Sequence, residues 1–424
     1  MKGEAPAVGD LREQLGYLRR RIARIDRKYA NGVSPVAAAP ASRKPDRYFA
    51  EEYLSGNEVE TPFGRHFETE KLYERQRRHG SIGICDLDQL PPHLLEPISN
   101  GAITQAPPHT WAFLDTETTG LAGGSGTYAF LVGVGRIATD GFRVRQFFMR
   151  DYGEEASLLH ALDEHLAQFE VLITYNGRTY DQPLLETRYR MARRHPPFDD
   201  LYHLDLLFGA RRLWKLRFES CRLVELEGRI LGVEREGDLP GEMIPYVYFE
   251  YLRKREIFRL VPIFHHNATD ILTLACLTAI VPWAFHSPEN AQFAHGAEMV
   301  GLGRWWRQAE NLENALALFR GAVERGLPDD LHFRTLWDIA CLEKKAGNHP
   351  AAARTLRELA QSPNPWRAAA FEELARHYEK RERNFAAALE MTVQALALEP
   401  SAALERRRAR LEKRFAQPQS QRLL

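Results

Sequence analysis

Apolar residues in the middle of the chain recur with the two-residue period of strands and the longer period of helices. An apolar run from Trp111 to Leu114 predicts a buried strand, and three further strands are expected over residues 128–137, 142–149 and 171–175. Stripes of leucine and other apolar residues predict helices over residues 156–169, 181–193 and 266–279. A three-stranded meander followed by helix, strand and helix predicts an α/β domain with a mixed sheet flanked by helices.

Beyond Pro288 the pattern changes to helices rich in alanine and leucine. An apolar residue and a small residue recur together about every 35 to 37 positions, at Leu302-Gly303, Ile339-Ala340 and Leu374-Ala375. Each pair is followed by a further small residue, at Ala315, at Ala352, and at Ala387 or Ala388. The spacing resembles the 34-residue period of tetratricopeptide repeats. We therefore expect an all-α tetratricopeptide-like repeat domain over residues 290–402, with a helical domain of another kind as the alternative.

The remaining segments carry weaker patterns. Residues 1–30 predict a basic amphipathic helix that docks on the protein, with a nucleic-acid-binding or partner-binding arm as the alternative. Residues 31–59 are expected to form a linker or irregular structure, and irregular structure is expected as far as Pro107. The glycine-rich stretch over residues 122–126 is interpreted as a turn, because it lacks the full phosphate-loop pattern. Residues 403–424 are expected to form a basic tail.

Length and composition exclude several classes. A chain of 424 residues accommodates about three domains, and its 44% apolar and 27% charged residues are typical of a globular protein. No run of about 18 apolar residues is evident, so no membrane span is expected. The N-terminus lacks the apolar core of a secretory signal, which favours a cytoplasmic location. The four cysteines form no CxxC pair, and the net charge is zero, so nucleic-acid binding would need a local basic patch.

Carboxylates follow the ends of several predicted elements. Asp115 and Glu117 follow the first buried strand two residues apart, so their side chains are expected on the same side of it. Asp181 stands where a strand passes into a helix, and Asp270 lies in the helix over 266–279. Each could be a helix cap or a local ion pair. Four acids gathered in one domain would instead need a cation between them, and a hard divalent ion prefers oxygen ligands.

Three motifs in this domain resemble those of a known nuclease superfamily. The motifs are Asp115-Thr-Glu117-Thr-Thr-Gly, Asn176-x-x-x-Tyr180-Asp181 and a His four or five residues before Asp270. Together they resemble the DEDD (DnaQ-like) 3′–5′ exonucleases, whose fold is ribonuclease H-like. The stretches Leu204-Asp205-Leu206-Leu207, Asp238-Leu-Pro-Gly241 and His266-Asn267-x-x-Asp270 look most like its YprB-like branch. The resemblance covers residues 60–285.

The resemblance implies a metal-dependent nuclease. Asp115, Glu117, Asp181 and Asp270 would hold two Mg²⁺ or Mn²⁺ ions about 4 Å apart, which activate a water and stabilise the leaving 3′ oxygen. A neutral histidine would serve as general base. His265 has the spacing of one subgroup and His266 that of the YprB-like pattern. The two side chains point about 100° apart on a helix, so one of them faces the acids. We favour His266 and keep His265 as the alternative.

Further residues are expected to bind the substrate. The candidates are polar, aromatic and basic side chains near the motifs: Thr118, Asn176, Tyr180, Arg211, Arg212, Trp214 and Lys215. Trp214 is also a candidate for core packing. The expected function is hydrolysis of single-stranded DNA or RNA from the 3′ end, with the repeats contacting a protein partner. The alternatives are a catalytically silent nucleic-acid-binding scaffold whose repeats recruit that partner, and a ribonuclease H-type endonuclease.

Overall fold

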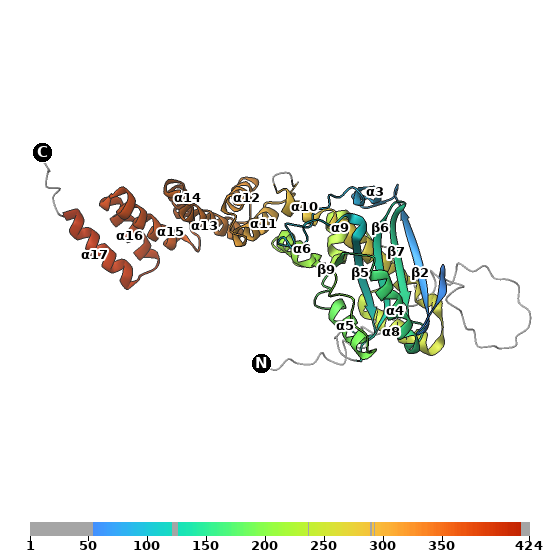
Figure 1. Ribbon diagram of the computed structural model, residues 1–424. Helices are drawn as coiled ribbons and strands as arrows, with labels where there is room; N and C mark the ends of the chain where they lie inside the picture. The colour runs from blue at the N-terminus through green and yellow to red at the C-terminus, as the bar shows by residue number, and fades with distance from the viewer. Residues whose placement is uncertain (1–53, 121–125, 236, 289–290, 292, 417–424) are drawn as a thin grey trace, which may run out of the picture. The chain divides into compact units, whose positions relative to one another are not determined.

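The computed structural model describes residues 54–120, 126–235, 237–288, 291 and 293–416. They divide into two compact units, labelled by element in Figure 1. The first unit ends at His286 and excludes residues 209–221, and the second unit joins residues 209–221 to the chain from Ser287 onward. The α/β domain and the separate helical region predicted from the sequence are confirmed. The predicted N-terminal helix over 1–30, most of the linker, and the glycine-rich stretch except Gly126 lie outside the described residues.

The first unit contains a mixed sheet of seven strands, counted over the described residues. The strand order is β1-β2-β7-β6-β5-β8-β9, in which β5, β8 and β9 are parallel and the other neighbours are antiparallel. The strands are β1 (Gly56–Thr61), β2 (Gly64–Glu74), β5 (Trp111–Thr118), β6 (Ala129–Ala138), β7 (Gly141–Phe148), β8 (Val171–Thr174) and β9 (Tyr202–Asp205). A separate two-stranded ribbon pairs β3 (Arg78–His79) with β4 (Ile82–Gly83).

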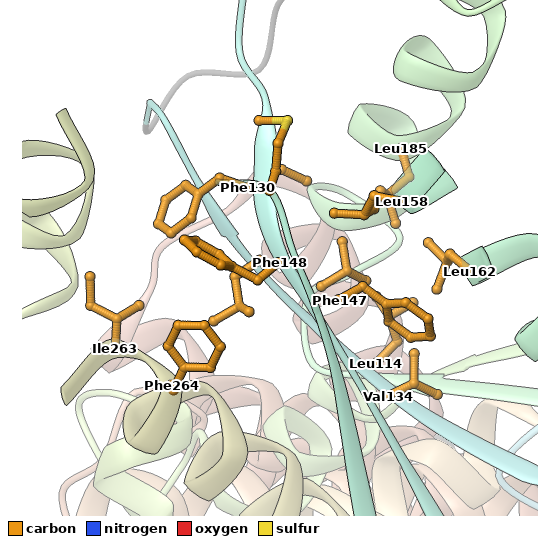
Figure 2. Close-up of a cluster of buried hydrophobic side chains, with 14 of the residues drawn as sticks. Leu114, Phe130, Val134, Phe147, Phe148, Leu158, Leu162, Leu185, Ile263 and Phe264 are labelled. Carbon is orange, nitrogen blue, oxygen red and sulfur yellow. The ribbon is translucent and has the colours of Figure 1, made fainter. Parts of the chain in front are cut away.

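Helices cover both faces of this sheet. The first unit contains α3 (Ile84–Leu87), α4 (Glu155–Leu166), α5 (Asp181–Met191), α7 (Leu223–Leu226), α8 (Ile244–Lys254), α9 (Val261–Thr278), α10 (Val281–His286) and the start of α6 (Leu206–Trp214), which belongs to the second unit from Gly209 onward. In Figure 2, Phe147 and Val134 meet Leu158 and Leu162 of α4 on one side of the sheet. On the other side, Phe148 packs against Phe264 of α9 with ring centroids 5.1 Å apart. Burial of these large apolar side chains is the main favourable contribution to folding.

The segment expected to be irregular before Pro107 instead supplies an edge hairpin. Strands β1 and β2 pair from Gly56↔Thr69 to Thr61↔Gly64, and β2 then pairs with β7. Their sequences, GNEVET and GRHFETEKLYE, are mostly polar because much of this edge is exposed. The apolar alternation that identifies a half-buried strand is therefore weak here. Strand β9 was also not predicted, since it is only four residues long.

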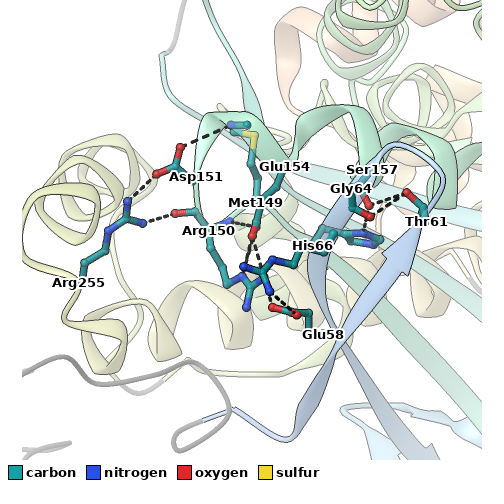
Figure 3. A network of polar contacts seen from close by, with 12 residues as sticks. Glu58, Thr61, Gly64, His66, Met149, Arg150, Asp151, Glu154, Ser157 and Arg255 are labelled. Carbon is teal, nitrogen blue, oxygen red and sulfur yellow. Dashed lines mark hydrogen bonds and ion pairs between the residues drawn. The ribbon is translucent and has the colours of Figure 1, made fainter.

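A partly buried polar network joins this hairpin to the rest of the first unit (Figure 3). The Ser157 hydroxyl on α4 lies 2.9 Å from Nδ1 of His66 and 2.8 Å from the Thr61 hydroxyl. Arg150 pairs with Glu58 of β1 at 2.6 Å and with Glu154 at 2.7 Å. Because His66 and Ser157 are fully buried, their hydrogen bonds satisfy polar groups that would otherwise be costly to bury.

The second unit is helical. Its helices are α11 (Gly296–Gln308), α12 (Leu312–Arg325), α13 (Asp329–Lys345), α14 (His349–Gln361), α15 (Arg367–His377), α16 (Phe385–Leu398) and α17 (Ala402–Ala416). Asn311, Asn348 and Asn384 accept a hydrogen bond from the third residue of α12, α14 and α16, which caps each helix. The small residues Ala315, Ala352 and Ala388 are buried. The tetratricopeptide assignment stays a prediction, and residues 403–416 of the expected tail form α17.

One segment among the described residues is long and apolar enough to cross a membrane by length and composition. It runs from Ile257 to His286, with a mean hydropathy of 1.6, and the expectation that the chain has no membrane span stays a prediction. The stretch includes α9 and α10, and 78% of its apolar window is buried inside the protein. Packing of α9 against β5, β6 and β7 accounts for its apolar composition. The four cysteines are free, with Cys221 and Cys276 buried, Cys85 half-buried and Cys341 exposed.

Candidate active site

Strand β5 carries the first two acids within the strand rather than beyond its end. Its parallel pairing with β8 stops at Phe113↔Ile173, whereas its antiparallel pairing with β6 continues through Asp115↔Gly133 and Glu117↔Leu131. The two carboxylates therefore lie where one neighbouring strand has already ended. Successive side chains alternate between faces, so Asp115 and Glu117 share one face and Thr116 projects from the other.

Helix α9 brings a third acid to the face that Asp115 and Glu117 share. Gly133 allows this close approach, because a Cβ atom there would lie 2.2 Å from Oδ1 of Asn267. Asn267 is fully buried and donates through Nδ2 to Oδ2 of Asp115 at 2.8 Å. Its Oδ1 accepts from Gln146 of β7 at 2.9 Å. Asn267 thereby links helix and sheet, and Asp270 follows it by three residues on the same helix.

Asp181 contacts β5 through Thr116. It is the first residue of α5 and accepts a hydrogen bond of 2.5 Å from the Thr116 hydroxyl. The loop before it is held by Asp205, whose carboxylate accepts from the backbone N–H of Asn176 at 2.8 Å and of Arg178 at 3.2 Å. Asn176 is exposed with a left-handed φ of 68°, and Tyr180 is half-buried immediately before Asp181.

Burial and mutual repulsion favour protonation of these carboxyl groups. Burial raises the pKa of Asp115 well above its ordinary value, and the charges of Asp270, Glu117 and Asp181 raise it further. Burial also raises the pKa of Glu117 to about 8, although the charge of His266 opposes this. The pKa of Asp181 rises to about 6 through burial, against the hydrogen bond from Thr116. The site thus carries more carboxylate than the protein's own cations balance.

Two cationic groups, Arg235 and His266, lie next to these carboxylates and partly balance their negative charge. Arg235 donates to Asp270 Oδ1 at 2.5 Å, pairs with Asp238 at 3.2 Å, and also bonds the buried Glu227. His266 lies with Nδ1 2.7 Å from Asp238 Oδ1 and Nε2 3.6 Å from Asp270 Oδ2. Burial opposes the charge on His266, but the hydrogen bond to Asp238 and the charges of Asp270 and Glu117 outweigh it and raise its pKa to about 10.

The two candidate histidines differ in their surroundings. His265 is exposed, and its Nδ1 lies 3.5 Å from the Lys71 ammonium. Burial of the ring and then the charge of Lys71 lower its pKa. It lines a cavity of about 350 Å³ together with Tyr73, Arg235 and Asp238. Only His266 of this pair has an ion-pair contact with one of the four acids in the described part of the chain. The assignment of either residue as the base stays a prediction.

The donors at this site are of the chemical type that a hard divalent cation prefers. Four carboxylates supply oxygen ligands, and a cation would stabilise the anionic forms of Asp115 and Glu117, whose pKa values burial raises most and neighbouring carboxylates raise further. The side chains of the described residues nevertheless form no group of three or more His, Cys, Asp or Glu arranged to hold a metal ion. Arg235 already occupies one oxygen of Asp270, and Thr116 one oxygen of Asp181.

The predicted substrate-binding residues fall into two groups. Thr118 lies on β5, where its hydroxyl donates to the Gly120 carbonyl at 2.7 Å, and Asn176 and Tyr180 flank Asp181 in the first unit. The basic cluster belongs to the second unit: Arg211, Arg212, Trp214 and Lys215. Arg212 donates to Gln308 of α11 at 3.0 Å, and Lys215 to the Glu219 carbonyl at 3.1 Å. Arg211 is exposed, whereas Trp214 is only 4% exposed and packs in the core.

Several residues at the site were given no role from the sequence alone. Asn267, Asp205 and Asp238 lie in stretches that carried the family resemblance, but nothing in the sequence indicated their contacts. No sequence pattern indicated a role for Arg235, because its partner Asp270 lies 35 residues further along the chain. Asn267 is the one residue that the sequence could have singled out. It is a polar residue in the apolar helix α9, and buried polar residues are usually hydrogen-bonded, so a polar contact there could have been predicted.

Comparison with known proteins agrees with this fold. A family model of the RNase_H superfamily matches residues 112–281, which include β5, β6, β7, β8, β9 and α9. Nucleases of this superfamily are typically hydrolytic, usually use divalent metals and bind nucleic acid. The chain is also 32% identical over 289 residues to the uncharacterized protein YprB of Bacillus subtilis (strain 168), covering 67% of this chain and 68% of that protein. The chain therefore belongs to the YprB family and carries a domain of the RNase_H superfamily.

Proposed function

We propose that this protein is a divalent-metal-dependent exonuclease that hydrolyses single-stranded DNA or RNA from the 3′ end. The observation that supports the proposal is that four acids from three elements influence one another: Asp115 and Glu117 of β5, Asp181 of α5 and Asp270 of α9. Electrostatic coupling links Asp115 to the other three carboxylates. A fold of the RNase_H superfamily supports hydrolysis of a phosphodiester. The direction of cutting rests on the resemblance of the motifs to DEDD exonucleases.

Each residue has a defined part in this proposal. The four carboxylates would hold Mg²⁺ or Mn²⁺, which when bound supplies Lewis acidity at the phosphate. Asn267 orients Asp115 through its hydrogen bond of 2.8 Å. His266 would accept the proton of the attacking water, which requires its neutral form. The hydrogen bond to Asp238 and the charges of Asp270 and Glu117 raise the pKa of His266 to about 10 against the effect of burial, so the proposal requires the carboxylate charge to be balanced when substrate is bound.

Two polar side chains near Asp181, the exposed Asn176 and the half-buried Tyr180, are suited to contact the substrate. Asn176 and Tyr180 lie in the loop that Asp205 holds, so an extended strand could be bound beside the acids. In the second unit, Arg211 and Lys215 offer exposed positive charge for phosphates. The helical second unit is also proposed to contact a protein partner, because stacked helices present extended surfaces.

The test is a time course on single-stranded DNA and RNA oligonucleotides labelled at the 5′ end. With Mg²⁺ or Mn²⁺, wild type is expected to give a ladder of labelled products that shorten stepwise. EDTA, Asp115→Asn and Asp270→Asn should each abolish the ladder, while Asp140→Asn, in the exposed β6–β7 turn, should leave it unchanged. Immediate release of a labelled mononucleotide would show the opposite direction, and internal fragments would show an endonuclease.

A catalytically silent scaffold is the second candidate, and one observation favours it. Asp270 is ion-paired to Arg235, so one ligand of the proposed metal site is already neutralised. A scaffold would bind the oligonucleotides with an affinity that EDTA and Asp115→Asn do not change, and would not shorten them. An exonuclease would shorten them in a reaction that both treatments stop.

A further inference from the structure

The segment between α7 and α8 contacts helix α9 beside Asp270. It begins with a π-helical turn over Glu227–Leu231 and continues to Asp238. The buried Glu227 accepts from Thr273 of α9 at 2.7 Å and pairs with His79 at 3.1 Å, which fixes the start of the segment. Arg235 bonds Glu227 and also reaches Asp270. The segment is therefore anchored on α9 through Thr273 and Asp270, within about two helical turns of His266.

Both oxygens of Asp238 have donors. Oδ1 accepts from Nδ1 of His266 at 2.7 Å and from the backbone N–H of Leu239 at 2.9 Å. Oδ2 accepts from Arg235 at 3.2 Å. These contacts lower the pKa of Asp238 even though burial acts to raise it, so the group is an anion. An anionic oxygen is only an acceptor, and Nδ1 of His266 must therefore carry the proton that they share.

The other ring nitrogen of His266 points at the acids. Nε2 lies 3.6 Å from Oδ2 of Asp270, which follows one helical turn later. The ring is held between Asp238 on one side and Asp270 on the other, with a side-chain exposure of only 15%. His265 has no such arrangement, because its Nδ1 faces Lys71.

We propose that Asp238 is a positioning residue for His266: it fixes the ring and keeps the proton on Nδ1, so that Nε2 faces the four carboxylates. This inference rests on the proposed nuclease function, in which Nε2 accepts the proton of the attacking water. A carboxylate that orients a histidine in this way sets the tautomer without itself taking up the proton.

Replacing Asp238 by asparagine tests the tautomer without changing the shape of the side chain. Asn has a single acceptor oxygen, and Arg235 can only donate. The charged Arg235 is a stronger donor than the Leu239 backbone N–H, which Oδ1 also accepts, so the amide oxygen would face Arg235 and the amide N–H₂ would face Nδ1 of His266. A donor in that place moves the ring proton to Nε2, and the nitrogen facing the acids would then be unable to accept a proton.

The kinetic experiment compares full-length wild type, Asp238→Asn and Asp140→Asn on the same labelled oligonucleotide with Mn²⁺. Loss of a correctly oriented base predicts that kcat of Asp238→Asn falls about 10²-fold or more, with KM changed less than about threefold. Asp140→Asn, an exposed carboxylate paired with Arg143, should match wild type. An unchanged kcat in Asp238→Asn overturns the proposal, and so does a loss that lies in KM alone.

A spectroscopic experiment tests the contact separately from the activity. In protein carrying ¹⁵N-labelled histidine, a ring N–H hydrogen-bonded to a carboxylate gives a downfield, slowly exchanging proton signal in both protonation states of the ring. We expect one such signal to be absent from both His266→Gln and Asp238→Asn, while circular dichroism of both variants matches wild type. If the signal that His266→Gln removes persists in Asp238→Asn, the positioning role is overturned whatever the activity. If wild type is inactive but the signal depends on Asp238, the nuclease proposal fails while the contact stands.

Discussion

At the scale of single residues, Asn267 connects the fold to the site. It is the only described residue that donates a side-chain hydrogen bond to Asp115, and its own carbonyl oxygen is satisfied by Gln146. Since Gln146 also bonds the Phe264 carbonyl and accepts from Thr69, one buried polar chain runs from β2 through β7 to the first acid. Buried polar networks of this kind are costly when partly broken.

Asn267→Ala is therefore expected to affect both stability and activity. Removing the amide takes one of three hydrogen-bond partners from Gln146 and leaves the carboxyl group of Asp115 without its side-chain donor, which costs roughly 1–3 kcal/mol of unfolding free energy. Activity should fall because Asp115 is no longer oriented. Urea unfolding with nuclease assays would measure both effects, and Thr187→Ala, which removes an exposed hydroxyl on α5, is the control. A variant as stable and active as wild type would contradict the role of Asn267.

The titration of the acids predicts how stability changes with pH. Glu117 has its pKa raised to about 8, so the folded state binds its proton more tightly and loses stability as pH rises from about 4.5 to 8. His266 has its pKa raised to about 10, so its stabilising contribution is complete below pH 6.5 and is lost as pH rises through 10. Between pH 7 and 9, the titration of Glu117 and that of His266 therefore both lower the free energy of unfolding as pH rises.

The unfolding temperature of EDTA-treated protein should therefore fall from pH 7 to pH 9. Saturating Mg²⁺ should reduce this fall, because a bound cation replaces the protons on the carboxyl groups. Glu117→Gln should also flatten the profile, since it removes one of the two titrating groups. Differential scanning fluorimetry across this range is the measurement. A metal-free unfolding temperature that rises from pH 7 to pH 9 would show that the acids do not repel one another as described.

At the scale of elements, the predicted strands and helices of the central region were found within a few residues. Strand β6 (Ala129–Ala138) and helix α4 (Glu155–Leu166) match the ranges inferred from apolar periodicity. Periodicity identifies such elements because each buries one face, and a fully buried strand such as β8 appears as an apolar run. The polar edge hairpin β1–β2 has no such periodicity to identify it. Arg235 and Asp238 could not be found from the sequence either, because their partners on α9 are brought near only by the folded chain.

The substitution Gly133→Ala tests whether α9 must pack as closely against strand β6 as the structure shows. A Cβ atom at this position would lie 2.2 Å from Asn267 Oδ1 and 2.3 Å from Ile271 Cδ1, so Gly133→Ala forces the helix away from β6. We expect a loss of about 1–3 kcal/mol in unfolding free energy and weaker activity, since α9 carries Asp270 and His266. Gly153→Ala, where a Cβ atom meets nothing within 4 Å, is the matched control in urea unfolding. Equal stability of the two variants would contradict this close packing.

At the scale of the whole molecule, the acids and the basic cluster belong to different units. The four carboxylates lie in the first unit, and Arg211, Arg212 and Lys215 in the second. The sequence alone suggested that this cluster lay within the nuclease domain, because residues 209–221 interrupt that domain in the chain. Their grouping with α11 and the following helices depends on tertiary contacts such as Arg212 with Gln308.

If the second unit helps to hold the substrate, removing this positive charge should weaken binding and leave chemistry intact. The triple variant Arg211→Ala, Arg212→Ala, Lys215→Ala should raise Kd for single-stranded oligonucleotides, with a shallower dependence on salt because fewer counterions are released. The value of kcat at saturating substrate should not change. Fluorescence anisotropy over a salt series would measure the effect, with Lys345→Ala, Arg354→Ala, Arg406→Ala as a charge-matched control. Equal losses in both triple variants would show that only overall charge matters.

The central claim is that four carboxylates from β5, α5 and α9 hold divalent cations, and calorimetric titration with Mn²⁺ tests it most directly. We predict saturable binding to wild type that is lost or strongly weakened in Asp115→Asn and in Asp270→Asn, and retained in Asp140→Asn. Binding that is absent from wild type, or that is equal in all four proteins, would contradict the account.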